Sequence, residues 1–233
     1  TAISEQGPVL DYLIVATKAP MTRAALEPLR ARLQPSTKVL LLQNGMGMLD
    51  ELQAAGFLGQ FSQAVITHGA YRITPSQVVH AGQGHTWVDA AWLAECAHYP
   101  DRWQAEHDMT QRLWHKLAVN CAINPLTALL NCRNGYLSVH PEARSLLQRA
   151  CQELQPLLSH YVPQLDAATL FEQVLAVAQA TSNNWSSMQQ DVQAQRRSEI
   201  DYLTGYALRQ AERIGLELPM HRTLYQLIRL RPA

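Results

Sequence analysis

The sequence lacks the features that mark several broad classes of protein. Its formal net charge is zero and its pI is about 7.1, so no basic surface indicates binding to nucleic acid or anionic lipid. No apolar run approaches the length of a membrane span, and no signal peptide opens the chain. We therefore expect no nucleic acid and no membrane among the partners of this protein.

Cysteine is scarce and shows no pairing pattern. The four cysteines have no C-x-x-C motif and no metal-ligand spacing; they are Cys96, Cys121, Cys132 and Cys151. Cys121 and Cys151 fall in apolar helical contexts, where a free buried thiol is the usual state. The sequence thus predicts a reducing, cytoplasmic location, no disulfide and no metal site.

Glycine is also missing where a nucleotide-binding fold would need it. No stretch matches the G-x-G-x-x-G fingerprint of dinucleotide-binding domains. The chain opens on Thr1 instead of Met, and a buried-type strand follows almost at once. We therefore expect the N-terminus of this sequence to be incomplete.

The first hundred residues alternate between strand and helix patterns. Two short apolar runs, at residues 12–16 (YLIVA) and 39–42 (VLLL), predict buried parallel strands. An amphipathic helix is predicted between them at residues 21–33, and residues 43–47 (QNGMG) predict a strand-to-helix turn. This βαβ order is typical of a doubly wound sheet, which binds ligands at the carboxyl ends of its strands, where Lys18 and Asn44 lie.

The next segment predicts antiparallel structure. Residues 65–67 form a short strand pattern that leads into His68, which we interpret as a structural residue. Gly82-x-Gly84 separates two alternating runs, at residues 77–80 and 85–88, and so predicts a hairpin turn. Residues 89–108 give little signal.

From about Asp108 the pattern is helical. Helices are predicted at residues 112–125, 142–161 and 166–180. Ser187-x-x-Gln190 matches a capping box, which predicts a helix that runs on to a stop at Gly215. The fold class is therefore α/β, with a partial Rossmann-type domain at residues 1–107 followed by an all-α domain at residues 108–233.

The helix at residues 112–125 holds the most informative polar pattern. Lys116, Asn120 and Asn124 are spaced i, i+4 and i+8, so they share one face of a mostly apolar helix. One interpretation is a pocket for a small oxygen-rich ligand; the other is a surface charge and two asparagines that hold a loop opened at Pro125. Only three of the nineteen basic residues are lysines, which favours a role that arginine cannot fill, because an amine can release its proton.

Glu199 lies among apolar residues of the predicted C-terminal helix, next to Ile200 and near Leu203. Its carboxylate is either a charge at the rim of the buried face, paired with Arg196, or a placed hydrogen-bond acceptor. The residues alone favour the pair with Arg196.

Together these segments resemble the ketopantoate reductase (2-dehydropantoate 2-reductase) family. The resemblance rests on residues 15–19 (VATKA), 43–47 (QNGMG), 113–128 (LWHKLAVNCAINPLTA), 131–135 (NCRNG), 186–191 (SSMQQD) and 199–202 (EIDY). It covers almost the whole chain in the expected order. The helix with Lys116 and the segment 187–202 are specific to the family, whereas the NGMG turn alone is not.

The resemblance implies a function and a set of site residues. The function is NADPH-dependent reduction of 2-dehydropantoate to pantoate in pantothenate and coenzyme A biosynthesis, by a cytoplasmic monomer or homodimer. The implied general acid is Lys116, and the implied substrate ligands are Asn120, Asn124, Asn134, Ser187 and Glu199. The implied cofactor contacts are Lys18, Asn44, Ala70 and again Glu199.

The sequence departs from the family at its start. The first βαβ unit, with its glycine fingerprint, is absent from these residues, and with it the arginine that would select a 2′-phosphate. Two alternatives therefore stay open beside the reductase: a related dehydrogenase that acts on another 2-oxo acid, and a non-catalytic helical binding module.

Overall fold

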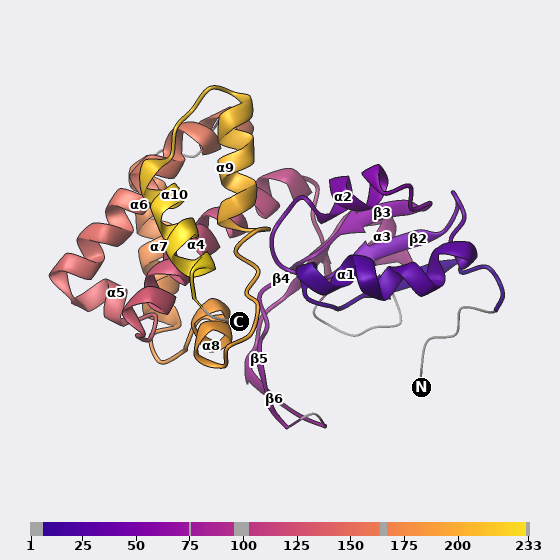
Figure 1. Ribbon diagram of the computed structural model, residues 1–233, viewed down its shortest axis with the longest axis horizontal. Coiled ribbons are helices and arrows are strands. Elements are labelled where there is room, and N and C mark those ends of the chain that lie inside the picture. The colour runs from indigo at the N-terminus through magenta and orange to yellow at the C-terminus, as the bar shows by residue number, and fades with distance from the viewer. Residues whose placement is uncertain (1–6, 75, 96–102, 164–166, 232–233) are drawn as a thin grey trace. The chain divides into compact units, whose positions relative to one another are not determined.

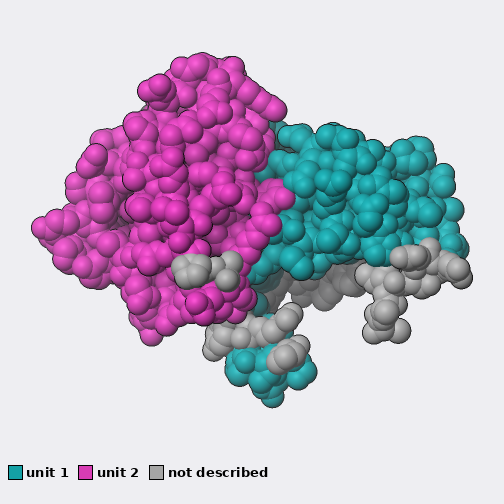
Figure 2. All heavy atoms as spheres, viewed as in Figure 1, with its two compact units in different colours: residues 1–112 teal, residues 113–233 magenta. Residues whose placement is uncertain are grey.

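The computed structural model describes residues 7–74, 76–95, 103–163 and 167–231. The chain divides into two compact units, residues 1–112 and 113–233 (Figure 2). Unit 1 mixes strands and helices and unit 2 is helical, so the predicted fold class is confirmed. The domain boundary predicted from the sequence, between residues 107 and 108, stays a prediction. Among the described residues, no helix is long and apolar enough to cross a membrane.

Unit 1 begins with a parallel sheet in the order β1-β2-β3, formed by Tyr12–Val15, Lys38–Leu41 and Gln60–Gln63. Val15 pairs with Leu41, so the chain leaves both strands at the same edge of the sheet. The central strand β2 is buried as predicted, with Val39, Leu40 and Leu41 inaccessible. The prediction for β1 was only partly right: Ile14 remains 41% exposed, because among the described residues β1 is paired on one side only.

The helices of unit 1 follow the strands closely. Helix α1 covers Ala19–Leu26, and a 3₁₀ turn, η1, continues it over Glu27–Arg32. The predicted single helix therefore changes form at Pro28, which has no backbone N–H to donate to the preceding turn. The predicted glycine turn after β2 is present, with φ of 83° at Gly45 and 95° at Gly47, and it leads into α2 (Met48–Ala54).

A second sheet in unit 1 has the order β4-β7-β8, from Val65–Ile66, Thr86–Val88 and Trp103–Ala105. Helix α3 (Ala90–Glu95) packs on it through Trp92, in one core with Leu40, Ala64 and Val88. This core joins the second sheet to the parallel one. The segment from residue 89 onward, whose sequence pattern is weak, thus supplies part of the core of unit 1.

The predicted hairpin turn at Gly82-x-Gly84 is wrong. Strand β6 (Gln77–Gly82) pairs instead with β5 (Gly69–Thr74) in a hairpin that projects from the rest of unit 1 (Figure 1), while β7 pairs with β4 and β8. Gly84 serves a different purpose: a Cβ atom there would lie 2.4 Å from the carbonyl carbon of Thr67. The second glycine is therefore needed for a close approach of two backbone segments.

Unit 2 is built around α4 (Met109–Leu130), whose residues from Leu113 onward belong to it. The other helices are α5 (Tyr136–Val139), α6 (Pro141–Tyr161), α7 (Ala167–Ala180), α8 (Ser187–Gln193), α9 (Thr204–Arg213) and α10 (Pro219–Arg229). Their core is dominated by fully buried leucines, such as Leu147, Leu154 and Leu170. The described cysteines Cys121, Cys132 and Cys151 are free thiols; Cys96 lies outside the described residues.

The predicted helix from Ser187 to Gly215 is wrong in its middle, because the chain forms two helices with an irregular segment between them. Helix α8 ends at Gln193, and Gln195 then takes a left-handed φ of 50°. The amide of Arg196 donates to the carbonyl of Asp191 at 2.8 Å, which closes the helix end. The predicted stop at Gly215 is present, with φ of 72° after α9.

A polar pair, Glu153 and His221, ties α10 to α6. The carboxylate of Glu153 accepts hydrogen bonds from the backbone amides of Met220 and His221, at 2.8 and 2.9 Å, and lies 2.7 Å from Nδ1 of the fully buried His221. Glu153 thus satisfies the free N–H groups at the start of α10.

Candidate functional site

Helix α4 presents the predicted row of one amine and two amides. Lys116 and Asn120 are partly buried, and Asn124 is buried. The helix continues through Pro125 to Leu130, so the alternative in which Asn124 and Pro125 open a loop is wrong. Because Pro125 has no N–H, the carbonyl of Cys121 loses its usual helical partner at this position. Most of the other residues of α4 between Trp114 and Ala128 are apolar and buried.

The environment of Lys116 favours loss of its proton. Burial lowers the pKa of Lys116 from 10.5 to about 8, while the negative charge of Glu199 acts in the opposite direction. An amine with a pKa near 8 can both hold and release a proton at the pH of a cell. These are the properties of a general acid in a partly dry site.

The structure overturns the interpretation of Glu199 as a rim charge paired with Arg196. Glu199 is only 7% exposed and interacts electrostatically with Lys116. Arg196 pairs instead with Asp191, at 3.1 Å. Glu199 also lies in the irregular segment between α8 and α9, and this break in the helix changes which way each side chain points.

An aromatic cluster holds the Lys116 end of α4 in place. The indole of Trp114, 2% exposed, stacks on the ring of Tyr161 with centroids 4.1 Å apart. The ring of Tyr206 lies 5.8 Å from the same indole. The hydroxyl of Tyr161 donates to Gln210, at 3.0 Å. Helices α4, α6 and α9 are therefore locked together within one turn of Lys116.

The far end of the row is tied to α8. The hydroxyl of Thr127 donates to Oγ of Ser186 at 2.7 Å, and the same oxygen accepts from the amide of Gln189. Ser186 is therefore the N-cap of α8, one residue before the predicted capping box. Ser187, the predicted substrate ligand, is exposed at the first position of α8. Ser186 was not predicted as a site residue, and it is Ser186 that ties the start of α8 to α4.

Asn134 is a predicted substrate ligand with a visible structural role. Its side-chain nitrogen donates to the hydroxyl of Thr181 at 2.9 Å, and its backbone amide donates to the carbonyl of Asn184. Its side-chain oxygen is buried and has no hydrogen-bond partner among the described residues. Asn134 thus holds the chain that follows α7.

Two of the predicted cofactor contacts follow parallel strands of unit 1. Lys18 is exposed at the start of α1, and Asn44 lies partly buried in the glycine turn after β2. Beside Asn44, the side chain of Gln43 is 6% exposed, and neither its nitrogen nor its oxygen has a hydrogen-bond partner among the described residues. A buried amide without partners is costly, which marks this edge of the sheet as a place for a polar ligand.

Ala70, the third predicted cofactor contact, lies in the β5-β6 hairpin. It pairs with His80 at a shift in the strand register and is exposed. The preceding His68 accepts from the amide of Gly84 at 3.2 Å, which agrees with the structural interpretation of this histidine.

No group of three or more His, Cys, Asp or Glu side chains is placed to hold a metal ion in the part of the chain that the structure describes. The polar groups that the two units do offer are an amine, carboxamides and a carboxylate. These groups recognise carbonyl, carboxylate and hydroxyl oxygens of an organic ligand.

Comparisons with known proteins identify the family of this chain. The family model "Ketopantoate reductase PanE/ApbA" matches residues 1–91, and "Ketopantoate reductase PanE/ApbA C terminal" matches residues 108–231. The 2-dehydropantoate 2-reductase of Vibrio cholerae is 39% identical over 94% of this chain and 77% of its own length. The fold and the sequence thus define a two-domain α/β protein of the oxidoreductase type. The chain belongs to the ketopantoate reductase family.

Solved structures share the fold. A PanE/ApbA family ketopantoate reductase from Ralstonia eutropha has a TM-score of 0.82 and 25% identity, over 94% of this chain and 75% of its own. D-mandelate dehydrogenase, solved with NADH and anilino(oxo)acetate, also has a TM-score of 0.82, over 98% of this chain and 78% of its own. At 20% identity, this second likeness concerns the fold alone.

Proposed function

We propose that this protein reduces 2-dehydropantoate to pantoate with a nicotinamide cofactor, NADPH, and that Lys116 is the general acid. The observation on which the proposal depends is the pairing of a partly buried amine of pKa about 8 with the buried carboxylate of Glu199. Membership of the ketopantoate reductase family supplies the substrate class.

The proposed chemistry follows from the row on α4. When hydride reaches the carbonyl carbon of a 2-oxo acid, negative charge develops on the carbonyl oxygen. The ammonium of Lys116 stabilises that charge and then donates its proton to the oxygen, which gives the alcohol. The amides of Asn120 and Asn124 orient the substrate's oxygens without adding charge, with Ser187 and Asn134 as further proposed ligands. Glu199 keeps the amine protonated until the transfer.

The proposed cofactor would be held in part by unit 1. Lys18, Asn44 and the backbone at Ala70 are the proposed contacts, and the unpartnered amide of Gln43 beside Asn44 fits a polar group of the cofactor. The nicotinamide, when bound, supplies the hydride that no side chain can supply. NADPH in preference to NADH is proposed from the family resemblance alone.

A substrate panel tests the proposal. We expect the protein, as its gene encodes it, to oxidise NADPH when 2-dehydropantoate is supplied, and not in its absence. A higher kcat/KM with another 2-oxo acid would favour the related dehydrogenase. Lys116→Ala should remove most of the turnover, and an unchanged kcat in this variant would reject Lys116 as the acid.

Ligand binding separates an enzyme from a non-catalytic module. A cofactor present at 100 times its dissociation constant should add about 2.7 kcal/mol to the free energy of unfolding. A helical binding module predicts no change in thermal stability with NADPH. A monomer or homodimer in the cytoplasm is proposed, and light scattering of the purified protein tests the oligomeric state.

A further inference from the structure

The irregular segment between α8 and α9, residues 194–203, carries two carboxylates with opposite surroundings. Glu199 is buried and interacts with Lys116. Asp201, two residues later, keeps 26% of its side chain exposed. Regular secondary structure does not hold the segment, so the direction of Glu199 depends on the side-chain and backbone contacts around it.

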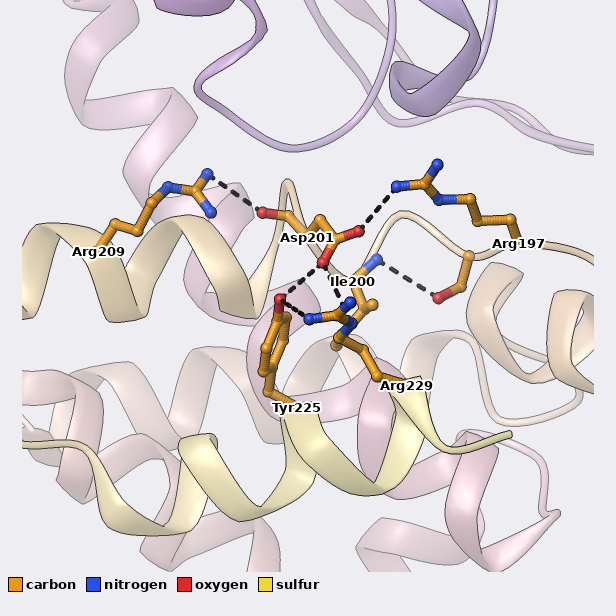
Figure 3. Close-up of polar contacts among 7 residues, drawn as sticks. Arg197, Ile200, Asp201, Arg209, Tyr225 and Arg229 are labelled. Carbon is orange, nitrogen blue, oxygen red and sulfur yellow. Dashed lines mark hydrogen bonds and ion pairs between the residues drawn. The ribbon is translucent and has the colours of Figure 1, made fainter. Parts of the chain in front are cut away.

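Asp201 is the centre of those contacts (Figure 3). Its carboxylate accepts a hydrogen bond from the hydroxyl of Tyr225 at 2.7 Å and one from the guanidinium of Arg197 at 3.2 Å. The backbone carbonyl of Asp201 accepts from the guanidinium of Arg209 at 3.2 Å. Arg229 completes the group, with Nη1 3.3 Å from the Tyr225 hydroxyl and Nε 4.0 Å from the carboxylate.

These contacts attach the segment to two helices. Arg209 belongs to α9, whereas Tyr225 and Arg229 belong to α10. Gly205, at the start of α9, allows the ring of Tyr225 to come close, because a Cβ atom there would lie 3.0 Å from Cε2 of that ring. Asp201 is thus held from both helices, although it is 24 residues away from Tyr225 in the chain.

Short backbone bonds transmit this attachment to Glu199. The amides of Tyr202 and Leu203 donate to the carbonyl of Glu199, at 3.0 and 3.1 Å. The amide of Gly205 donates to the carbonyl of Ile200 at 2.9 Å. Ile200 is itself only 4% exposed. The turn that contains Glu199 therefore moves as one piece with Asp201.

We propose that Asp201 is a positioning residue that, with Tyr225 and the three arginines, holds the carboxylate of Glu199 toward Lys116. The inference rests on the proposed function for its catalytic meaning, but the geometry it describes can be measured without the reaction. Charge–charge interactions fall with distance, so a loosened Glu199 supports the proton on Lys116 less strongly.

The experiment measures the ionisation of Lys116 directly. NMR titration of protein with ¹³C-labelled lysine side chains follows the lysines individually, and the resonance missing from Lys116→Ala is that of Lys116. The variants are Asp201→Ala and Tyr225→Phe, the second of which removes a single oxygen and preserves the packing. Each is also made in a Glu199→Gln background.

Arg222→Gln is the matched control. It breaks the exposed ion pair between Arg222 and Glu212, at 2.7 Å, which also joins α10 to α9 but is separate from the contacts described around Asp201. Thermal unfolding of each variant shows whether a shift in the Lys116 pKa is accompanied by a loss of helix packing.

We expect Glu199→Gln to lower the Lys116 pKa by about one unit or more, because it removes the nearby negative charge. Asp201→Ala should lower it by about half a unit and Tyr225→Phe by less, since an effect that acts through Glu199 cannot exceed the loss of its charge. In the Glu199→Gln background neither substitution should shift the pKa further, whereas Arg222→Gln should leave it unchanged in either background.

Two results would overturn the inference: a wild-type Lys116 pKa in both Asp201→Ala and Tyr225→Phe, or shifts as large in the Glu199→Gln background as in the wild type. The proposed function fails separately. If Lys116→Ala keeps its turnover while the titration follows the expected order, the general acid is wrong and the positioning role of Asp201 stands.

Discussion

The two units treat buried polarity differently. In unit 1 the buried polar side chains that the structure describes are uncharged: Thr22, Thr37, Gln43 and Thr86. In unit 2 the buried set includes Asp191, Glu199 and His221, and the partly buried Lys116 interacts with Glu199. Buried charge is therefore concentrated in unit 2, the unit to which we assign the proposed proton chemistry.

Removal of the amine in unit 2 should have the largest effect. We expect Lys116→Ala to lower kcat by roughly 10²- to 10⁴-fold, the usual contribution of a general acid. The matched control is Lys38→Ala in unit 1, where Nζ lies 5.5 Å from the ring of Tyr12 and has no proposed part in the chemistry. Steady-state oxidation of NADPH measures both, and an equal loss in the two variants would break the assignment of charge chemistry to unit 2.

The pH dependence sharpens the same point. Reduction requires protonated Lys116, so kcat/KM for reduction should be constant below its pKa of about 8 and fall about tenfold per pH unit above it. The oxidation of pantoate needs the neutral amine, so its kcat/KM should have the opposite pH dependence and fall below the pKa of Lys116. Initial rates in both directions between pH 6 and 10 measure this, and a reduction rate that rises above pH 8 would contradict it.

Unit 1 should be more sensitive to backbone crowding than to charge. We expect Gly84→Ala to lower the free energy of unfolding by about 1–3 kcal/mol, because the new Cβ atom would lie 2.4 Å from the backbone of Thr67. Gly82→Ala is the control, since its Cβ atom would meet nothing closer than 3.8 Å. Denaturant titrations compare them, and equal stabilities would show that the backbone at Gly84 does not approach Thr67 so closely.

The smallest expected effect concerns the unpartnered amide of unit 1. Gln43→Leu removes two buried polar atoms without partners, so it should stabilise the ligand-free protein by about 1 kcal/mol. The same change should weaken the stabilisation that NADPH confers. Gln34→Leu, at an exposed position, is the control. If Gln43→Leu left the affinity for NADPH unchanged, Gln43 would not be part of the cofactor site.

Local patterns predicted the parts of the molecule that neighbouring residues determine. The parallel strands before Lys18 and Asn44, the left-handed glycines of the turn and the polar row on α4 follow from short-range periodicity. The end of α9 was predictable because Gly215 supplies the left-handed residue. The end of α8 was not, because Gln195 takes the same conformation without being glycine or asparagine.

Contacts between distant residues could not be read in this way. The sequence places Arg196 nearer to Glu199 than Lys116 is, and so favoured the wrong partner for this carboxylate. Only the folded helices bring residues 116 and 199 together, and only they bring Tyr225 to Asp201. The same limit explains the error at Gly82-x-Gly84. The strand before these glycines, β6, pairs with β5, whereas the strand after them, β7, pairs with β4 in another sheet.

The attachment of α10 to α6 gives the molecule a weak side toward acid. Although burial opposes its charge, hydrogen bonds from His221 and from the backbone amides of Met220 and His221 hold the pKa of Glu153 below its usual range. A carboxylate of this kind stabilises the fold at neutral pH, and that stabilisation is lost as the pH falls through its lowered pKa. Since α10 also carries Tyr225, acidification through this pKa should loosen the helix whose tyrosine holds Asp201.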